Sequence, residues 1–301
     1  MADTDQLRRF LFEHSPVRGY LVRLNASWRA TIEHHAYPTV VRDALGEAMA
    51  ATALLAGTMK FEGRLTLQIQ GAGPLHLLVT QCTESFALRG VARYRGDVPT
   101  GTLAEITGEG RVTVTIESAD QDTRYQGVVP LIGQGLAEGL QEYFALSEQV
   151  PTRLWLAADG DQAAGLLLQK LPTGSSASAE DDLGARAEAE DLWERVSLLA
   201  ATLTPAELLG WSDTEVLQRL FHEEDVRHFE PVPVSFRCAC SRARTSSMLR
   251  ALGEAETLDI IAKEGEVTVT CEFCNRAYRF DAVDVAALFS EVPLPGDRQL
   301  H

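Results

Sequence analysis

Four of the five cysteines lie near the C-terminal end of the chain. Cys238 and Cys240 form a C-x-C motif, and Cys271 and Cys274 form a C-x-x-C motif. Thiolates at such spacings can bind one metal ion from a tight turn, and four thiolates are a common tetrahedral ligand set of structural zinc. Unrelated buried cysteines would seldom show chelate spacing twice. The sequence therefore predicts one Zn²⁺ per chain, held by these four sulfurs.

The residues around the motifs favour a reactive site, although most four-thiolate zinc sites are inert scaffolds. Five arginines surround the ligand positions, and positive charge favours the thiolate form: Arg237, Arg242, Arg244, Arg276 and Arg279. In a C-x-C motif, the neighbouring thiol can react at once with an oxidised sulfur. Bound zinc contributes about 10–16 kcal/mol of apparent folding free energy in small domains, whereas disulfides that close very short loops stabilise little. Oxidation is therefore predicted to unfold this part of the chain.

The remaining candidates for chemistry have simpler interpretations. Cys82 follows an apolar run and is expected to be a small buried hydrophobe. His222 and His228 precede the cysteine motifs and could bind metal, but as single histidines they are expected to face solvent. None of these residues predicts catalysis.

Composition restricts the class of protein. The chain has 301 residues, and 43 Asp plus Glu against 27 Lys plus Arg give a net charge of −16. Such a charge disfavours binding to nucleic acid or to anionic lipid. The longest nearly apolar run, residues 48–57, is too short to span a membrane, and residues 1–10 lack the apolar core of a secretion signal. We expect a cytoplasmic protein without membrane contact, in a reducing compartment that favours metal over permanent disulfides.

Residues 1–172 are predicted to form an α+β domain. Alternating polar and apolar residues indicate strands, and helical spacing indicates two longer helices. The strands are expected at 64–70, 75–81, 87–94, 111–116, 125–131 and 153–157, and the helices at 40–59 and 135–149.

Residues 173–232 are predicted to form an acidic helical linker that folds conditionally. After small and polar residues at 172–179, the segment 175–230 contains fourteen Asp or Glu, four Arg and no Lys. Leu192, Val196, Leu199 and Leu203 form one apolar stripe, and capping boxes begin at Thr204 and Ser212. Short helices need a packing partner to persist in water. We expect these helices to lean on the C-terminal unit and to lose that partner on oxidation.

Residues 233–301 are predicted to form a small zinc-binding unit. Helices are expected at 242–252, up to residue 263 and from residue 281, and strands at 266–270 and 277–280. A unit of this size rarely folds on core burial alone, so it needs the metal.

Several motifs resemble the 33-kDa heat-shock protein family, the redox-regulated bacterial holdase chaperones, over nearly the whole length. The motifs in the first domain are residues 17–19, 60–63, 65–68, 124–127 and 154–160, and those in the zinc unit are 236–240, 271–274 and 278–281. The acidic linker resembles the family least.

The resemblance implies a stress-activated binding protein, not an enzyme. The reduced form would bind one zinc through the four cysteines and be inactive. Oxidation would release zinc, join Cys238 to Cys240 and Cys271 to Cys274, and unfold the linker. The active form would be a homodimer that holds unfolded or partly unfolded client proteins without ATP.

Two other functions remain open at this stage. A zinc-dependent thiol–disulfide oxidoreductase would use Cys271 and Cys274, but needs a strand-to-helix context that the flanking strands do not offer. A zinc-ribbon accessory factor of transcription or translation would need a basic, aromatic-rich face, which residues 235–301 lack with eight Lys or Arg and ten Asp or Glu.

Overall fold

The computed structural model describes residues 5–118, 124–131, 135–172 and 179–290. The chain forms two compact units, residues 1–237 and 238–301. Most of the predicted connector, residues 173–178, lies outside the described residues. None of the helices within the described residues is both long and apolar enough to cross a membrane.

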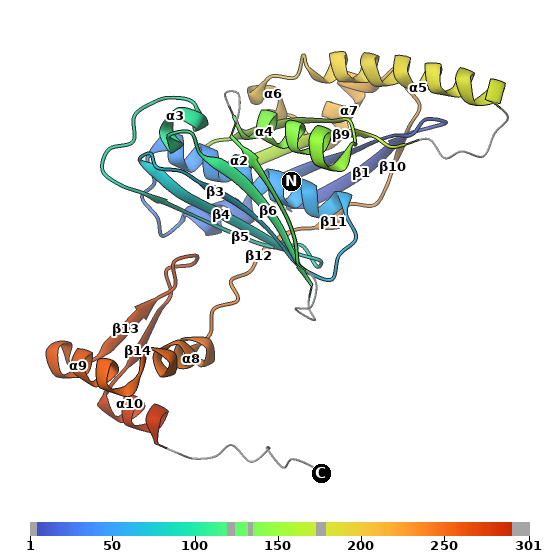
Figure 1. Cartoon of the computed structure of the whole chain (residues 1–301). Coiled ribbons are helices and arrows are strands. Elements are labelled where there is room, and N and C mark those ends of the chain that lie inside the picture. The colour runs from blue at the N-terminus through green and yellow to red at the C-terminus, as the bar shows by residue number, and fades with distance from the viewer. Residues whose placement is uncertain (1–4, 119–123, 132–134, 173–178, 291–301) are drawn as a thin grey trace, which may run out of the picture. The chain divides into compact units, whose positions relative to one another are not determined.

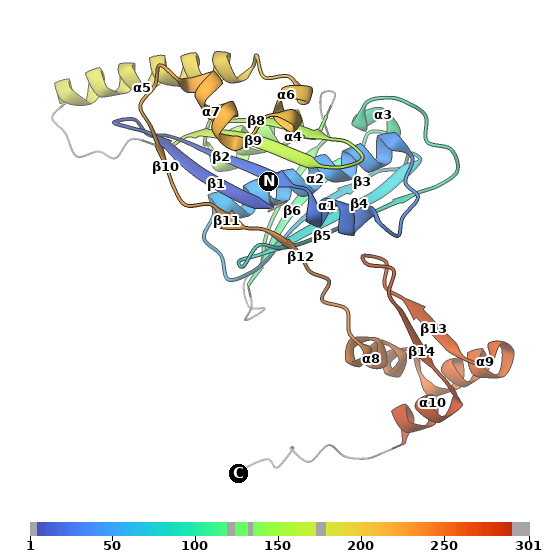
Figure 2. The same ribbon diagram turned by 180° about the vertical axis from the view of Figure 1, so that it is seen from behind.

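The first unit contains two six-stranded sheets (Figures 1 and 2). One sheet has the order β10-β1-β2-β9-β8, with β11 also on β1. Its long strands are β1 Gln6–Phe12, β2 Val17–Leu24, β8 Thr152–Ala158 and β9 Ala163–Lys170, and its short strands are β10 Val226–His228 and β11 Val232–Pro233. The other sheet has the order β12-β5-β4-β3-β6-β7. It is formed by β3 Gly63–Gln70, β4 Leu75–Thr83, β5 Ala87–Tyr94, β6 Arg111–Ser118, β7 Arg124–Pro130 and the short β12 Ser235–Phe236. All six predicted strands are confirmed within one or two residues at each end.

A central helix, α2 (Thr39–Thr58), lies between the sheets and contacts strands of both (Figure 1). Small residues allow the close approach: a Cβ added at Gly46 would lie 2.4 Å from the Cβ of Ala158. The predicted helix at 40–59 is confirmed. Because α2 buries side chains against both sheets, it carries the main core of this unit.

The smaller helices of this unit depart in part from the prediction. The predicted helix at 135–149 is α4, Leu136–Tyr143, followed by a π-helical turn, Phe144–Glu148. Two short helices, α1 (Ala26–Ile32) and α3 (Leu103–Thr107), were not predicted. Each has fewer than eight residues, which is too short for helical spacing to stand out.

The acidic linker forms three helices on the outer face of the first sheet (Figures 1 and 2). They are α5 Ala179–Ala200, α6 Pro205–Gly210 and α7 Asp213–Phe221. The predicted stripe is confirmed: Leu192, Val196 and Leu203 are buried and Leu199 packs beside them. The capping boxes at Thr204 and Ser212 are confirmed too.

The predicted packing partner of these helices is wrong. Their apolar side chains are buried within the first unit, on Phe10, Phe12, Leu166 and Leu168 of β1 and β9. The sequence did not identify this sheet face, because β9 is apolar along almost its whole length and shows no alternation. A strand buried on both faces loses that pattern.

After α7 the chain becomes an extended segment, residues 225–237, which we call the strap. Its strands β10 (Val226–His228) and β11 (Val232–Pro233) pair antiparallel with β1. Its last strand, β12 (Ser235–Phe236), pairs parallel with β5. The strap therefore adds two short strands to the first sheet and one to the second.

The second unit contains the predicted elements. They are α8 Arg242–Leu252, α9 Glu254–Glu264, β13 Val267–Thr270, β14 Ala277–Phe280 and α10 Ala282–Phe289. Its buried core consists of Leu249, Val267, Phe280 and Val285, with six partly buried side chains around it. So small a core is consistent with a unit that needs a metal to fold.

Candidate metal centre

Two loops of the second unit carry the four cysteines. Cys238 and Cys240 follow the strap directly and precede Ser241, the N-cap of α8. Cys271 and Cys274 lie in the turn between β13 and β14, which Asn275 closes in the left-handed conformation, with φ of 55°. The C-x-x-C motif is thus at a hairpin turn and not at a helix N-terminus, the position that activates the thiol in thioredoxin-like oxidoreductases.

The four sulfurs form one cluster. The Sγ atoms of Cys238 and Cys271 are 3.5 Å apart, those of Cys240 and Cys274 are 3.4 Å apart, and all four lie within 4.8 Å of one another. Disulfide-bonded sulfurs would be about 2.05 Å apart. Tetrahedral zinc with bonds of about 2.3 Å places its sulfurs about 3.8 Å apart. The predicted residues are therefore brought together as a set that could hold a metal ion; zinc as that ion stays a prediction.

The donor set also fits a cation electrostatically. Burial, reinforced by hydrogen bonds to the other three sulfurs, raises the pKa of the Cys274 thiol to about 12. The Cys274 thiol therefore resists deprotonation in the protein alone. A divalent cation reverses this balance, since metal coordination deprotonates a thiol outright.

One polar neighbour of the sulfurs was missed by sequence analysis. The Tyr278 hydroxyl donates a hydrogen bond to Cys240 Sγ over 3.1 Å. The hydrogen bond that Arg276 donates to the Tyr278 oxygen, and then electrostatic attraction to that oxygen and to the Cys240 and Cys274 sulfurs, raise the pKa of Arg276. The signal available in the sequence was the position of Tyr278 in the strand that follows the C-x-x-C turn.

The predicted arginines have different roles. Arg276 interacts with the sulfurs, and Arg244 Nη1 donates to the carbonyl of Ala239, between the first two ligands, over 2.8 Å. Arg242 pairs with Asp284 and Arg279 with Glu266. The arginines are thus shared between the metal centre and the packing of the unit around it.

The other sequence candidates lie apart from this cluster. Cys82 is fully buried, and burial raises the pKa of its thiol to about 12, which leaves it unreactive. His222 and His228 are exposed, as predicted. Neither belongs to a metal-binding group among the described residues.

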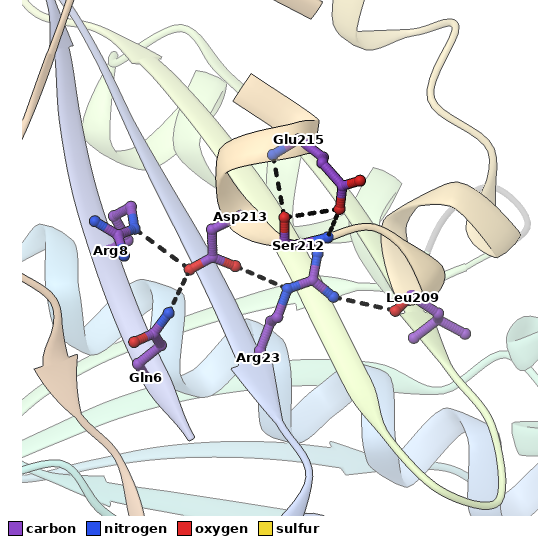
Figure 3. A network of polar contacts seen from close by, with 7 residues as sticks. All are labelled: Gln6, Arg8, Arg23, Leu209, Ser212, Asp213 and Glu215. Carbon is purple, nitrogen blue, oxygen red and sulfur yellow. Dashed lines mark hydrogen bonds and ion pairs between the residues drawn. The ribbon is translucent and has the colours of Figure 1, made fainter. Parts of the chain in front are cut away.

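A second polar cluster fixes the linker to the first sheet (Figure 3). Asp213, the first residue of α7, has a side chain only 4% exposed, and its carboxylate faces β1 and β2. The carboxylate accepts from Arg23 Nε at 2.8 Å, from Gln6 Nε2 at 2.7 Å and from Arg8 Nε at 3.4 Å. Arg23 Nη1 also donates to the Leu209 carbonyl at the end of α6 over 3.1 Å. We call these five residues the Asp213 lock.

The lock is only partly satisfied. Its carboxylate benefits from the positive end of α7, where the Ser212 and Glu215 side chains form the capping box. However, Arg23 Nη2 is buried and has no hydrogen-bond partner within the described parts of the chain. Sequence analysis found the capping box but not the lock, because the partners on β1 and β2 lie about 200 positions earlier in the chain.

Comparison with known proteins gives consistent matches. The sequence profile of the family described as Hsp33 protein matches residues 5–281. The 33 kDa chaperonin of Nitrosococcus oceani is 51% identical over 97% of this chain and 96% of its own length, and that of Methylobacillus flagellatus is 43% identical over the full length of both. The crystal structure of the 33 kDa chaperonin of Thermotoga maritima superimposes with a TM-score of 0.78 at 25% identity, covering 95% of this chain and 98% of that one.

Proposed function

This chain belongs to the Hsp33 family, and we propose that it is a redox-regulated holdase, inactive when reduced and bound to one Zn²⁺ through Cys238, Cys240, Cys271 and Cys274. The observation that carries the proposal is the clustering of these sulfurs directly after the strap. The last hydrogen bond of the strap, from Arg237 N to Leu88 O, immediately precedes Cys238. A chemical change at the sulfurs therefore acts on the end of the linker.

The trigger is a two-electron oxidation within each motif by a peroxide. One thiolate attacks a peroxide oxygen, the O–O bond breaks, and a sulfenic acid forms as hydroxide or alkoxide leaves. The second thiolate of the motif displaces hydroxide from that sulfur and forms the disulfide. Two peroxides thus convert four thiolates into the Cys238–Cys240 and Cys271–Cys274 disulfides, and no sulfur remains as a metal ligand.

Loss of the metal site unfolds the second unit. Bound zinc supplies charge neutralisation and a cross-link between the two cysteine loops, about 10–16 kcal/mol in small domains. The new disulfides close loops of only a few residues and recover little of that free energy. Four buried core side chains cannot hold the unit without the metal.

Release of the linker follows from the loss of its C-terminal anchor. Its helices are held by buried side chains of α5, α6 and α7, among them Val196, Leu208 and Phe221, and by the Asp213 lock, in which Arg23 Nη2 has no hydrogen-bond partner among the described residues. When the residues after Arg237 lose their order, the strap is anchored at one end only. The linker then frays from its C-terminal end.

The released form offers surfaces that suit unfolded proteins. Phe10, Phe12, Leu166 and Leu168 lose the helices that cover them, and the acidic linker keeps the exposed surface soluble. Clients are held by this binding surface without ATP and without catalysis, in the cytoplasm under oxidative stress. The same apolar surface supports a homodimer of the oxidised form.

The test combines oxidation with four readouts. Peroxide at mildly raised temperature should release one zinc per chain, remove four free thiols and suppress the aggregation of an unfolding client protein. Catalysed insulin reduction without that suppression would favour an oxidoreductase, and tight RNA binding would favour an accessory factor. Either result, or an oxidised protein as resistant to protease as the reduced one, would contradict the proposal.

A substitution tests the effect of losing the metal separately from the effect of oxidation. Cys271→Ser removes one ligand and should lower zinc affinity and loosen the linker even under reducing conditions. Cys82→Ser is the matched control, since this cysteine lies in the core of the first unit and outside the cluster. Unchanged protease resistance of the linker in Cys271→Ser would show that the metal and the linker are not coupled.

A further inference from the structure

We propose that the strap occupies the sheet edges to which an unfolded client binds as an added β-strand. The inference rests on the proposed function and names the partner of the released form: an extended polypeptide segment. In the reduced state the protein's own residues 225–237 fill that position. Activation would exchange an internal strand for an external one.

The first edge is that of β1. On one side β1 pairs with β2, and on the other side its described partner is the strap. Phe229 N donates to Arg9 O over 3.1 Å and Glu13 N donates to Asp225 O over 2.9 Å, in the register that places Leu11 opposite Arg227. Farther along, Val234 N donates to Asp5 O over 3.0 Å.

The second edge is that of β5. The strap leaves β1 after Val234 and pairs parallel with β5: Ser235 N donates to Phe86 O over 3.1 Å, and Arg237 N donates to Leu88 O over 3.0 Å. One extended segment of thirteen residues therefore pairs with the edges of both sheets. Figure 2 shows it passing from β10 and β11 to β12 along the side of the first unit.

The strap is held mainly by its backbone. Most of its side chains are exposed, among them Arg227, His228, Glu230, Val232, Pro233 and Ser235. The side-chain contacts are fewer. Val234 is buried, Val226 and Phe236 are half-buried, and the Phe229 ring lies under the Arg9 guanidinium with its centroid 5.0 Å away. The exposed Arg227 guanidinium also donates two hydrogen bonds to the Glu13 carboxylate. Backbone pairing with a few side-chain contacts gives affinity without demanding one sequence. Such a site suits unfolded chains, which share a backbone and offer occasional apolar residues.

Release of the strap leaves both edges open. On the first edge, the backbone groups of Arg9 in β1 and of Glu13 just after β1 then lack their partners. On the second edge, the same holds for Phe86, just before β5, and for Leu88 in β5. Open edges with unpaired N–H and C=O groups are templates for another extended chain. A client segment therefore satisfies the same groups that the strap satisfies in the resting protein.

The register allows a sharp test with peptides of the strap sequence. Arg227 and Phe229 lie in hydrogen-bonded pairs with β1, whereas Val226 and His228 lie opposite Phe12 and Phe10 in the alternate pairs, so their N–H groups point away from β1. One peptide of residues 225–237 is N-methylated at Arg227 and Phe229. Its matched control is N-methylated at Val226 and His228, with the same side chains and the same number of methyl groups.

Binding is measured by fluorescence anisotropy on the oxidised full-length protein, together with displacement of a chemically unfolded client. We expect the unmodified peptide and the control to bind alike and to displace client. The peptide methylated at Arg227 and Phe229 should bind about tenfold or more weakly, because it lacks two backbone donors toward β1. Hydrogen exchange at residues 9–13 should rise on oxidation and fall again when client is added.

Three results would overturn the inference. Equal binding of the two methylated peptides would show that side chains alone hold the client. Unchanged exchange at residues 9–13 on client addition would place the client elsewhere. Dissociation of an oxidised dimer by the control peptide, without displacement of client, would assign these edges to the strap of a second copy. If oxidised protein suppresses aggregation in the same assay, the proposed function survives any of these results.

Discussion

Substitution of Asp213 by Asn tests whether charge in the lock holds the linker down. The change keeps the size of the side chain but removes the negative charge that three donors share, at a position only 4% exposed. Arg23 and Arg8, which are 12% and 22% exposed, then lie beside a neutral amide. The apolar stripe and the metal centre are not altered.

The expected cost is that of breaking a buried ion pair, about 3–5 kcal/mol, because an uncompensated charge remains. Since 1.36 kcal/mol corresponds to a factor of ten, the population of undocked linker should rise by about two to three and a half powers of ten. Part of Arg23 reaches solvent, so the lower end of this range is the better expectation. Zinc affinity should stay unchanged.

The assay is hydrogen exchange or limited proteolysis of the reduced, zinc-loaded protein across residues 184–237. The matched control is Asp191→Asn on the same linker, where an exposed carboxylate pairs with Arg195 at i,i+4 and should contribute less than about 1 kcal/mol. The variant should open the linker, suppress client aggregation without oxidant and keep its zinc; the control should do none of this. Equal protection of the linker in both variants would refute a role for the lock.

Three further substitutions probe the stripe, the metal centre and the core. Val196→Asp buries a charge against the first sheet and should expose the linker to protease without changing zinc affinity. Leu198, on the same helix, is 71% exposed, so Leu198→Asp should leave the linker protected. Equal digestion of the two variants would contradict the packing of α5 on the first sheet. Tyr278→Phe removes the hydroxyl that donates to Cys240 Sγ and should weaken zinc binding about 10–100-fold in a chelator competition. Unchanged zinc affinity would contradict a role of this hydroxyl at the sulfurs. Burial raises the pKa of Glu47 to about 7, so its contribution to stability is full below about pH 4.5 and is lost as the pH rises through 7. Glu47→Gln should therefore raise the free energy of unfolding by up to about 3 kcal/mol in urea titrations at pH 8 and by little at pH 5; the same effect at both pH values would show that ionisation of Glu47 is not involved.

The sequence predicted the features whose signals are local. Alternation located β3 and β6, helical spacing located α2 and the stripe at Val196, and cysteine spacing located the cluster of four sulfurs that could hold a metal ion. Each of these signals needs only a few neighbouring residues, because a strand or helix face repeats at short range.

The features that the sequence did not predict depend on distant partners. The Asp213 lock joins α7 to β1 and β2, and the strap joins residues 225–237 to the first strand of the chain. Neither the residues around Asp213 nor those of the strap form a sequence pattern that indicates the partner in space. The wrong prediction of the packing partner of the linker helices has the same cause. Because β9 is buried on both faces, its sequence shows no alternation that would mark one face as a packing surface.

These distant contacts bear on how the linker is held on the first unit. A purely apolar interface would make the docked linker more stable, because buried ion pairs often contribute less than apolar residues of similar volume. At Asp213 the protein instead has charged groups that fix α7 in one position, and Arg23 Nη2 has no hydrogen-bond partner within the described residues. The strap adds backbone hydrogen bonds that, in the proposed active form, an unfolded chain would replace. A linker held in this way is specific in its docked position, and under the proposed switch part of its hold would pass to the client on release.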